Sequence, residues 1–139
     1  MLEKCNELTK LDLSETKVTG DLNALENVMG LERLYLSQTE VAGDLKSLQN
    51  ATDLRRLHLS DTKVEGDLKA LPKATELRSL DLSNTKVEGN IESLHKATKL
   101  QWLYLSNTNV FGYMASLREA KELKDVKITG TQIAGARCF

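Results

Sequence analysis

The sequence lacks the features that would point to a membrane protein or a disulfide-stabilised one. No apolar run approaches the roughly 20 residues of a membrane-spanning helix. Residues 1–7 have neither the basic start nor the apolar stretch of a signal peptide. The two cysteines, Cys5 and Cys138, are too few for a disulfide scaffold or a structural zinc site. We therefore expect reduced thiols, a cytoplasmic location and no contact with a membrane.

An excess of charge of one sign is also missing. The chain of 139 residues has 19 Lys plus Arg against 20 Asp plus Glu, which gives a formal net charge of −1. The two signs are mixed along the chain, so there is no basic stripe that could bind nucleic acid. A hydrophobic content of 40% is enough to bury a core, which argues against a disordered tail.

The chain repeats every 23 residues, in rows that begin at Leu8, Leu31, Leu54, Leu77, Leu100 and Leu123. Each row reads Leu-x-x-(Leu/Val)-x-(Leu/Ile), then Ser or Thr, then x-Thr-x-(Val/Ile)-x-Gly, and no row contains an insertion. All 25 leucines occupy only five positions of the row. A strict period of this length is typical of a solenoid, in which stacked repeats bury their apolar faces against each other. The sequence therefore predicts one domain, residues 1–139, of about six repeats with partial repeats at both ends.

Each row predicts a strand, a turn and a short helix. Apolar fourth and sixth positions alternate with polar third, fifth and seventh positions, as in a strand with one buried face. The glycine of the row, such as Gly43, suits a turn with positive φ or a close backbone approach. Asp44 follows it and precedes Leu45 and Leu48, which indicates a short helix with an Asp N-cap. The fold class is therefore α/β, with a parallel sheet on one side and short helices on the other.

This pattern resembles the leucine-rich repeat family, and the resemblance covers essentially the whole chain. It implies a right-handed solenoid with parallel strands on a curved, concave face and with short helices and turns on the convex face. Family members usually have Asn or Cys where these rows have Thr16, Thr39, Thr62, Thr85, Thr108 and Thr131. Because a hydroxyl can donate one hydrogen bond and accept another, we expect an inward-facing threonine ladder to replace that residue.

The resemblance also implies that function lies on the concave face, at the third and fifth positions of the rows. These positions include the only Trp and two of the three Tyr, and exposed aromatic and Arg side chains are frequent in binding hot spots. We predict a protein-binding surface formed by Arg33, Tyr35, Arg56, His58, Asp81, Trp102 and Tyr104. The alternative is that these positions merely tolerate polar and aromatic side chains, which cross-strand pairs favour in any case.

Two further aromatic residues, Phe111 and Tyr113, break the pattern of the fifth row. Other rows have Thr, Ala or Glu at the first of these positions, and mostly Asp or Asn at the second. The pair could cover the last row, or it could form a second contact patch. Both interpretations stay open at the level of sequence.

The ends of the chain show none of the cysteine-rich caps typical of secreted members of the family, and solenoid ends normally need polar caps. Cys5 takes a position that is small and buried in other rows, so we expect it in the core. Arg137 takes a leucine position, so the leucine pattern stops there. The favoured function is a non-enzymatic protein-interaction module. The alternative is a structural or assembly segment, in which open ends pair with another copy or continue in a longer array.

Catalysis and cofactor binding are not indicated. His58, Ser60 and Asp81 share the strand face, but Ser60 belongs to a column of serines, and no nucleophile elbow or oxyanion hole accompanies it. His95 lies in a helical segment on the side opposite His58, which leaves no cluster of metal ligands. We therefore predict no enzyme activity, no metal site and no cofactor.

Two other ligand classes fit the repeats less well. Asp21, Asp44 and Asp67 could form a calcium ladder, but helix capping explains them without a metal. Stacked hydroxyls could bind ice or sugar, but the threonines should point inward, and charged residues flank the serines.

Overall fold

The computed structural model describes residues 7–72 and 75–135 of the chain. Cys5, Cys138 and the end of the leucine pattern at Arg137 lie outside these residues. Within the described ranges, no helix is long and apolar enough to cross a membrane.

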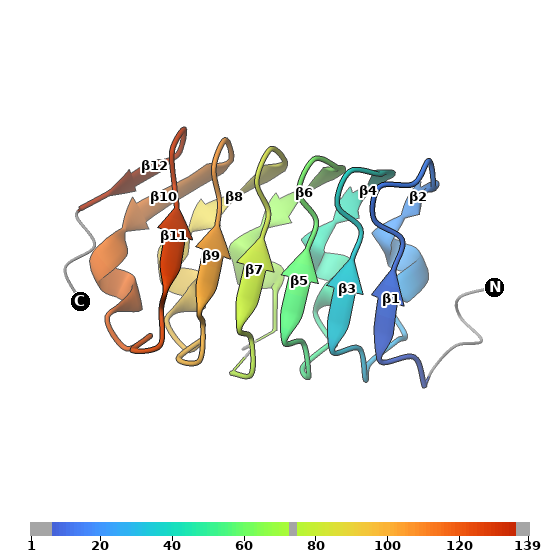
Figure 1. Cartoon of the computed structure of the whole chain (residues 1–139), viewed down its shortest axis with the longest axis horizontal. Helices are drawn as coiled ribbons and strands as arrows, with labels where there is room; N and C mark the ends of the chain where they lie inside the picture. The colour runs from blue at the N-terminus through green and yellow to red at the C-terminus, as the bar shows by residue number, and fades with distance from the viewer. Residues whose placement is uncertain (1–6, 73–74, 136–139) are drawn as a thin grey trace.

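Six coils stack along one axis, and each contributes one strand to a parallel sheet, here called the front sheet (Figure 1). The front sheet consists of β1 (Lys10–Asp12), β3 (Arg33–Tyr35), β5 (Arg56–His58), β7 (Ser79–Asp81), β9 (Trp102–Tyr104) and β11 (Asp125–Lys127), in this order. Every neighbouring pair is in the register of the 23-residue period, so that Leu34 pairs with Leu57 and Leu57 with Leu80. The strands predicted from the apolar alternation are therefore confirmed.

A second parallel sheet, here called the back sheet, was not predicted. It consists of β2 (Thr19–Asp21), β4 (Glu40–Asp44), β6 (Lys63–Asp67), β8 (Lys86–Asn90), β10 (Asn109–Tyr113) and β12 (Gln132–Ala134). The sequence predicted a turn around the glycine of this segment. The glycine does have positive φ, at 115° in Gly43, but it lies within the strand. The core lies between the two sheets, where Leu57, Val64 and Leu80 are each 0% exposed.

The segments after the back strands are 3-10 helices of three or four residues. They are η2 (Leu22–Leu25), η3 (Leu45–Leu48), η4 (Leu68–Ala70), η5 (Ile91–Leu94) and η6 (Met114–Leu117). The predicted caps are confirmed, because Asp44 Oδ1 accepts a hydrogen bond of 2.8 Å from the Lys46 N–H, and Asn90 caps η5 in the same way. Such a cap satisfies one backbone donor of the first turn. Tyr113, at the corresponding position before η6, makes no side-chain cap bond.

The threonine ladder is confirmed and closes the turn that follows each front strand. Thr62 is 8% exposed, and its hydroxyl donates a bond of 2.6 Å to the Leu59 carbonyl. The Val64 N–H approaches the same hydroxyl at 3.5 Å. Asp61, inside this turn, has a φ of 55°, which a non-glycine residue adopts only when its surroundings hold it there. The side chain of each threonine thus completes a turn that the backbone alone leaves open.

The threonine bond gives a direct test of stability. Thr62→Val keeps the shape of the side chain but removes the donor, so that the buried Leu59 carbonyl loses its partner. We expect the free energy of unfolding in urea to fall by about 1–3 kcal/mol. The exposed Thr52→Val is the matched control, and an equal loss in both variants would contradict this role of the hydroxyl.

The glycine position gives a second test. A Cβ atom on Gly43 would lie 2.6 Å from Asp21 Oδ1 and 2.9 Å from the Leu22 nitrogen, whereas a Cβ on Gly20 would meet no atom within 4 Å. Both residues have positive φ, so Ala strains the backbone at either position. We expect Gly43→Ala to reduce the unfolding free energy by about 1–3 kcal/mol more than Gly20→Ala, because only Gly43→Ala adds overpacking. Equal losses would mean that φ alone requires the glycine.

Candidate functional site

All seven predicted binding residues lie on the outer face of the front sheet, on four neighbouring strands. We call them the strand-face patch: Arg33 and Tyr35 on β3, Arg56 and His58 on β5, Asp81 on β7, and Trp102 and Tyr104 on β9. The strand register sets Arg33 beside Arg56, Tyr35 beside His58, and Asp81 beside Tyr104. The spacing within the patch is therefore fixed by the backbone ladder of the sheet.

A hydrogen bond and an aromatic contact hold His58 in place. Its Nε2 atom is 2.7 Å from Ser79 Oγ, and Tyr35 meets its ring edge-on at a centroid distance of 5.0 Å. Ser79 is 6% exposed and lies on β7 beside Arg56. Sequence analysis did not single out Ser79, because a serine at a strand position carries no signal until its neighbour is known.

The surroundings of His58 favour its neutral form. Burial lowers the pKa of His58 below its ordinary value of 6.5. The charge of Asp81 opposes this effect, and the charge of Arg56 adds to it. At neutral pH the ring is therefore an uncharged hydrogen-bonding group within the patch.

The two aromatic residues of β9 are covered on one side by residues of the last coil. Lys124 Nζ lies 5.3 Å from the centre of the Trp102 ring, and Lys127 Nζ lies 4.8 Å from the centre of the Tyr104 ring. The Tyr104 hydroxyl donates a bond of 3.0 Å to Asp125 Oδ2. Burial, together with this bond and the nearby carboxylates, raises the pKa of Tyr104. Cation–π contacts and the hydrogen bond thus orient both rings before any partner binds.

The two arginines of the patch are exposed and lie side by side. Within residues 7–72 and 75–135, neither Arg33 nor Arg56 has a carboxylate within ion-pair distance, although the adjacent Arg55 lies 3.8 Å from Glu32. Like charges on directly opposite strand residues repel each other. An anionic group placed between the two guanidinium groups would relieve this repulsion.

The hydrogen bonds of His58 and Ser60 do not join these two residues to each other. Ser60 donates to Ser37 within the serine column at 2.9 Å, whereas His58 bonds to Ser79. His95 lies on the helical side, where its Nδ1 donates to the Glu92 carbonyl at 2.9 Å. Among the described residues, no three His, Cys, Asp or Glu side chains come together in an arrangement that could hold a metal ion.

The possible second patch lies on the back sheet. Phe111 and Tyr113 belong to β10 and are 45% and 70% exposed. Side chains two residues apart on a strand point to the same face. The neighbouring strand β12 pairs with β10 but leaves both rings exposed, and this exposure favours a contact patch over a cover for the last coil.

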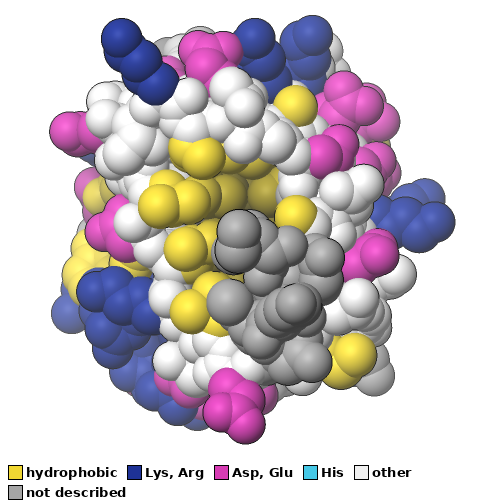
Figure 2. Space-filling model, turned by 90° about the vertical axis from the view of Figure 1, so that its right-hand side faces the viewer, with side chains coloured by type: hydrophobic (Ala, Val, Ile, Leu, Met, Phe, Trp, Pro, Cys, Tyr) yellow, Lys and Arg dark blue, Asp and Glu magenta, His cyan; other side chains and the backbone are white. Residues whose placement is uncertain are grey.

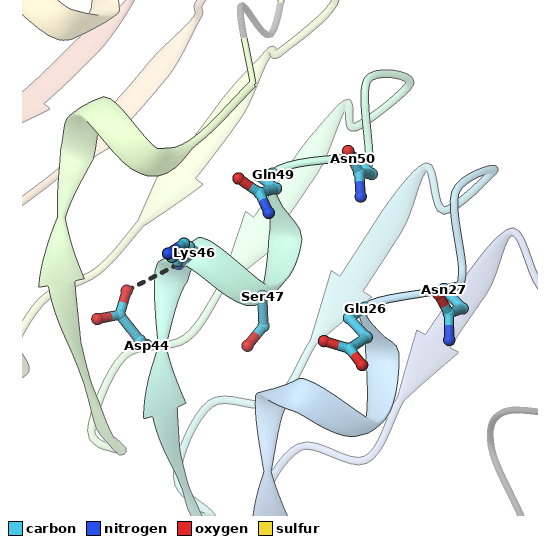
Figure 3. Close-up of a pocket in the computed structure, with 7 residues that line it drawn as sticks. All are labelled: Glu26, Asn27, Asp44, Lys46, Ser47, Gln49 and Asn50. Carbon is cyan, nitrogen blue, oxygen red and sulfur yellow. Dashed lines mark hydrogen bonds between the residues drawn. The ribbon is translucent and has the colours of Figure 1, made fainter.

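A hollow of about 270 Å³ lies on the helical side, between η2 and η3 (Figure 3). Its lining is polar and comes from Glu26, Asn27, Asp44, Lys46, Ser47, Gln49 and Asn50. The Asp44 side chain is already used by the Lys46 N–H of the cap. Small-molecule sites are usually lined by apolar groups around a few convergent polar atoms, and this hollow lacks that character.

Solved structures identify the architecture, whereas no protein-family model and no curated protein matches the chain. A TDR receptor aligns at a TM-score of 0.79 and 24% identity, over 92% of this chain and 23% of that one. The LRR ectodomain of the receptor kinase SOBIR1 from Arabidopsis thaliana aligns at 0.76 and 21%, over 90% of this chain and 73% of that one. This chain is a leucine-rich repeat solenoid.

The same leucine-rich repeat architecture occurs in a protein with another activity. A plant ice-binding protein aligns at a TM-score of 0.75 and 26% identity, over 92% of this chain and 42% of that one. The chain thus spans less than half of this protein and less than a quarter of the TDR receptor. Because one solenoid serves different ligands, the function must be argued from the surface side chains.

The lowered pKa of His58 predicts a pH dependence of stability. The unfolded chain binds this proton near pH 6.5, whereas the folded chain resists it. The contribution of neutral His58 is therefore complete above pH 6.5 and is lost as the pH falls from 6.5 toward the folded-state pKa. We expect NMR titration to place the His58 midpoint below 6.5.

The matched variant is His58→Gln, compared with the parent chain by urea unfolding near pH 8 and near pH 5. The parent should lose more stability between the two values than the variant does. An equal loss, or a His58 midpoint above 6.5, would contradict the dominance of burial at this site.

Proposed function

We propose that this chain is a non-enzymatic protein-interaction module that binds a protein partner through the strand-face patch. The observation that carries the proposal is the gathering of aromatic and arginine side chains on one rigid face. Such residues provide most of the binding energy at protein interfaces. The repeats agree closely at their buried positions, whereas the exposed positions of the front sheet differ from coil to coil.

The mechanism is presentation on a rigid scaffold. The patch residues are fixed in spacing by parallel strands, and Tyr35, Trp102 and Tyr104 are already half-buried and in contact with neighbours. A partner therefore does not have to order these side chains, and less conformational entropy is lost on association. Trp102 and Tyr104 act as anchors at one side of the patch.

The chemistry of the patch favours a partner segment that combines an apolar group with an acidic or phosphorylated one. Arg33 and Arg56 lack a carboxylate partner among the described residues, and Arg forms bidentate bonds with carboxylate and phosphate groups. Asp81 lies between the arginine and aromatic halves of the patch. Because its carboxylate repels an acidic group, the acidic part of the partner is expected to stay on the side of Arg33 and Arg56.

The comparisons support this proposal at a coarser level. A receptor and the ectodomain of a receptor kinase share the fold, and a receptor role is consistent with an interaction module. The cytoplasmic setting is a further part of the proposal and rests on the low cysteine content. The ectodomain neighbour shows that the fold itself is compatible with other compartments.

A selection from a phage-displayed library of random peptides tests the proposal. Peptides captured by the parent chain would be measured against Trp102→Ala and Arg56→Ala. We expect Trp102→Ala to weaken binding roughly 30-fold, about 2 kcal/mol, and Arg56→Ala to weaken most the peptides that carry acidic residues.

The matched control is the pair Phe111→Ala and Tyr113→Ala on the back sheet, which should leave the affinity of these peptides unchanged. If the strand-face variants stay within about 0.5 kcal/mol of the parent while the back-sheet variants lose binding, the second patch is the interaction surface and the proposal is wrong.

A further inference from the structure

The two outer strands of the front sheet, β1 and β11, each pair with another strand on one side only among the described residues. They lie at opposite ends of the long axis of the molecule (Figure 1). An outer strand presents a row of backbone groups that can pair with a further strand. The chemistry of these two edges shows what kind of strand each would accept.

Both ends expose the apolar positions that are buried in the inner coils. Leu57 and Leu59 are 0% exposed, whereas the equivalent Leu11 and Leu13 in the first coil, and Val126 and Ile128 in the last, are only partly buried. Figure 2 views the N-terminal end and shows hydrophobic side chains around a hollow, with polar and charged side chains around them. Leu11, Leu13, Leu22 and Leu25 are among its lining residues. Each end thus resembles one half of an inner coil-to-coil interface.

The backbone groups of the two edges are complementary. Inside the sheet, the third residue of a row donates to the second residue of the preceding row, as in the 3.1 Å bond from the Arg56 N–H to the Glu32 carbonyl. The sixth residue donates to the fifth residue of the following row, as from Leu59 to Asp81 at 2.8 Å.

By the same rule, the Lys10 N–H and the Asp12 carbonyl of the first coil have no backbone partner among residues 7–72 and 75–135. In the last coil, the Lys124 carbonyl and the Ile128 N–H have no backbone partner within the same part of the chain. If the last coil of one copy is set against the first coil of another, each donor therefore meets an acceptor.

The charged side chains match in the same register. If β11 of one copy pairs with β1 of the next in the register found inside the sheet, Asp125 faces Lys10 of the next copy and Lys127 faces its Asp12. Within the front sheet of one copy, no neighbouring pair at the third or fifth position of the rows joins a carboxylate to a Lys or Arg. Lys10 and Arg33, the first such pair, are both cations. Opposite charges on facing strand residues stabilise a sheet. The two opposite-charge pairs would form only where one end meets the other.

We propose that copies of this chain stack head to tail, with β11 of one copy adding in parallel to β1 of the next. The occupant of each end is a second copy of the chain. Further repeats of a longer chain could cover the same apolar surfaces, but they would not require the two ends to match each other in charge. Because the contact is heterologous, stacking continues as an open assembly with no fixed number of copies.

This inference goes beyond the proposed function and leaves the strand-face patch accessible. The patch lies on β3 to β9, and the junction involves β1 and β11. The two surfaces meet at Tyr104, which contacts Asp125 and Lys127 of β11. A stack would therefore display one patch per copy along one line, and a partner with several binding segments would gain affinity from their linkage.

Sedimentation velocity of the 139-residue chain, from micromolar to near-millimolar concentration, tests the stacking. We expect the mass to rise with concentration above the 15.5 kDa of one copy. Lys10→Asp combined with Asp12→Lys creates two like-charge pairs at the junction and should weaken self-association at least roughly tenfold. Asp125→Lys combined with Lys127→Asp should have the same effect.

Mixing these two variants restores both opposite-charge pairs, so that an equimolar mixture should associate as the parent does while each variant alone does not. This rescue also excludes misfolding as the cause of the loss. The matched control exchanges the exposed pair Lys63 and Glu40 on the back sheet, 2.9 Å apart, and should change nothing.

A mass that stays at 15.5 kDa at every concentration overturns the proposal. Association that ignores both charge reversals overturns it as well, because other contacts then hold the copies together. Peptide binding by the strand-face patch is measured separately, so either result leaves the test of the proposed function intact.

Discussion

The packing of each leucine on its counterpart in the next coil is the interaction on which the rest of this structure depends. Leu34, Leu57, Leu80 and Leu103 follow each other through the sheet, and each is 0% exposed. No coil could bury these side chains by itself. Their removal from water offsets the conformational entropy that is lost when each coil is ordered. The strict period follows from this, because one extra residue in any coil would displace every contact with its two neighbours.

The sequence predicts those parts of the fold that depend on the type of side chain at a given position of the row. Buried leucines mark the front strands, Asp44 and its equivalents mark the caps, and the threonine position marks an inward hydroxyl. The back sheet escaped prediction because a segment such as Lys63–Asp67 carries only one buried valine and a glycine. Its strand arises from the extended segment of the neighbouring coil, which supplies backbone partners whatever the side chains are.

In the candidate site too, some residues can be recognised from their own type, whereas others matter only because of their neighbours in the next coil. Aromatic and arginine residues stand out in the sequence by type, and the strand register brings them to one face. Ser79, Lys124, Lys127 and Asp125 could not be recognised, because their roles depend on the ring or hydroxyl that the next coil places beside them. Sequence analysis therefore finds candidate anchors more readily than the residues that orient them.

The constant register between coils also bears on how such a molecule can change over time. Every inner coil meets its neighbours through the same positions, so whole coils are interchangeable parts of the architecture. Loss of residues 54–76 in one step would place Arg33 beside Ser79 and Tyr35 beside Asp81, and would leave the leucine contacts in phase. The distance from Arg33 to Trp102 and Tyr104 would shrink by one strand spacing, about 4.8 Å, while Arg56 and His58 would be lost with the deleted coil. The architecture thus lets evolution adjust the span of a recognition surface in discrete steps of one coil, while the core packing of the remaining coils is kept.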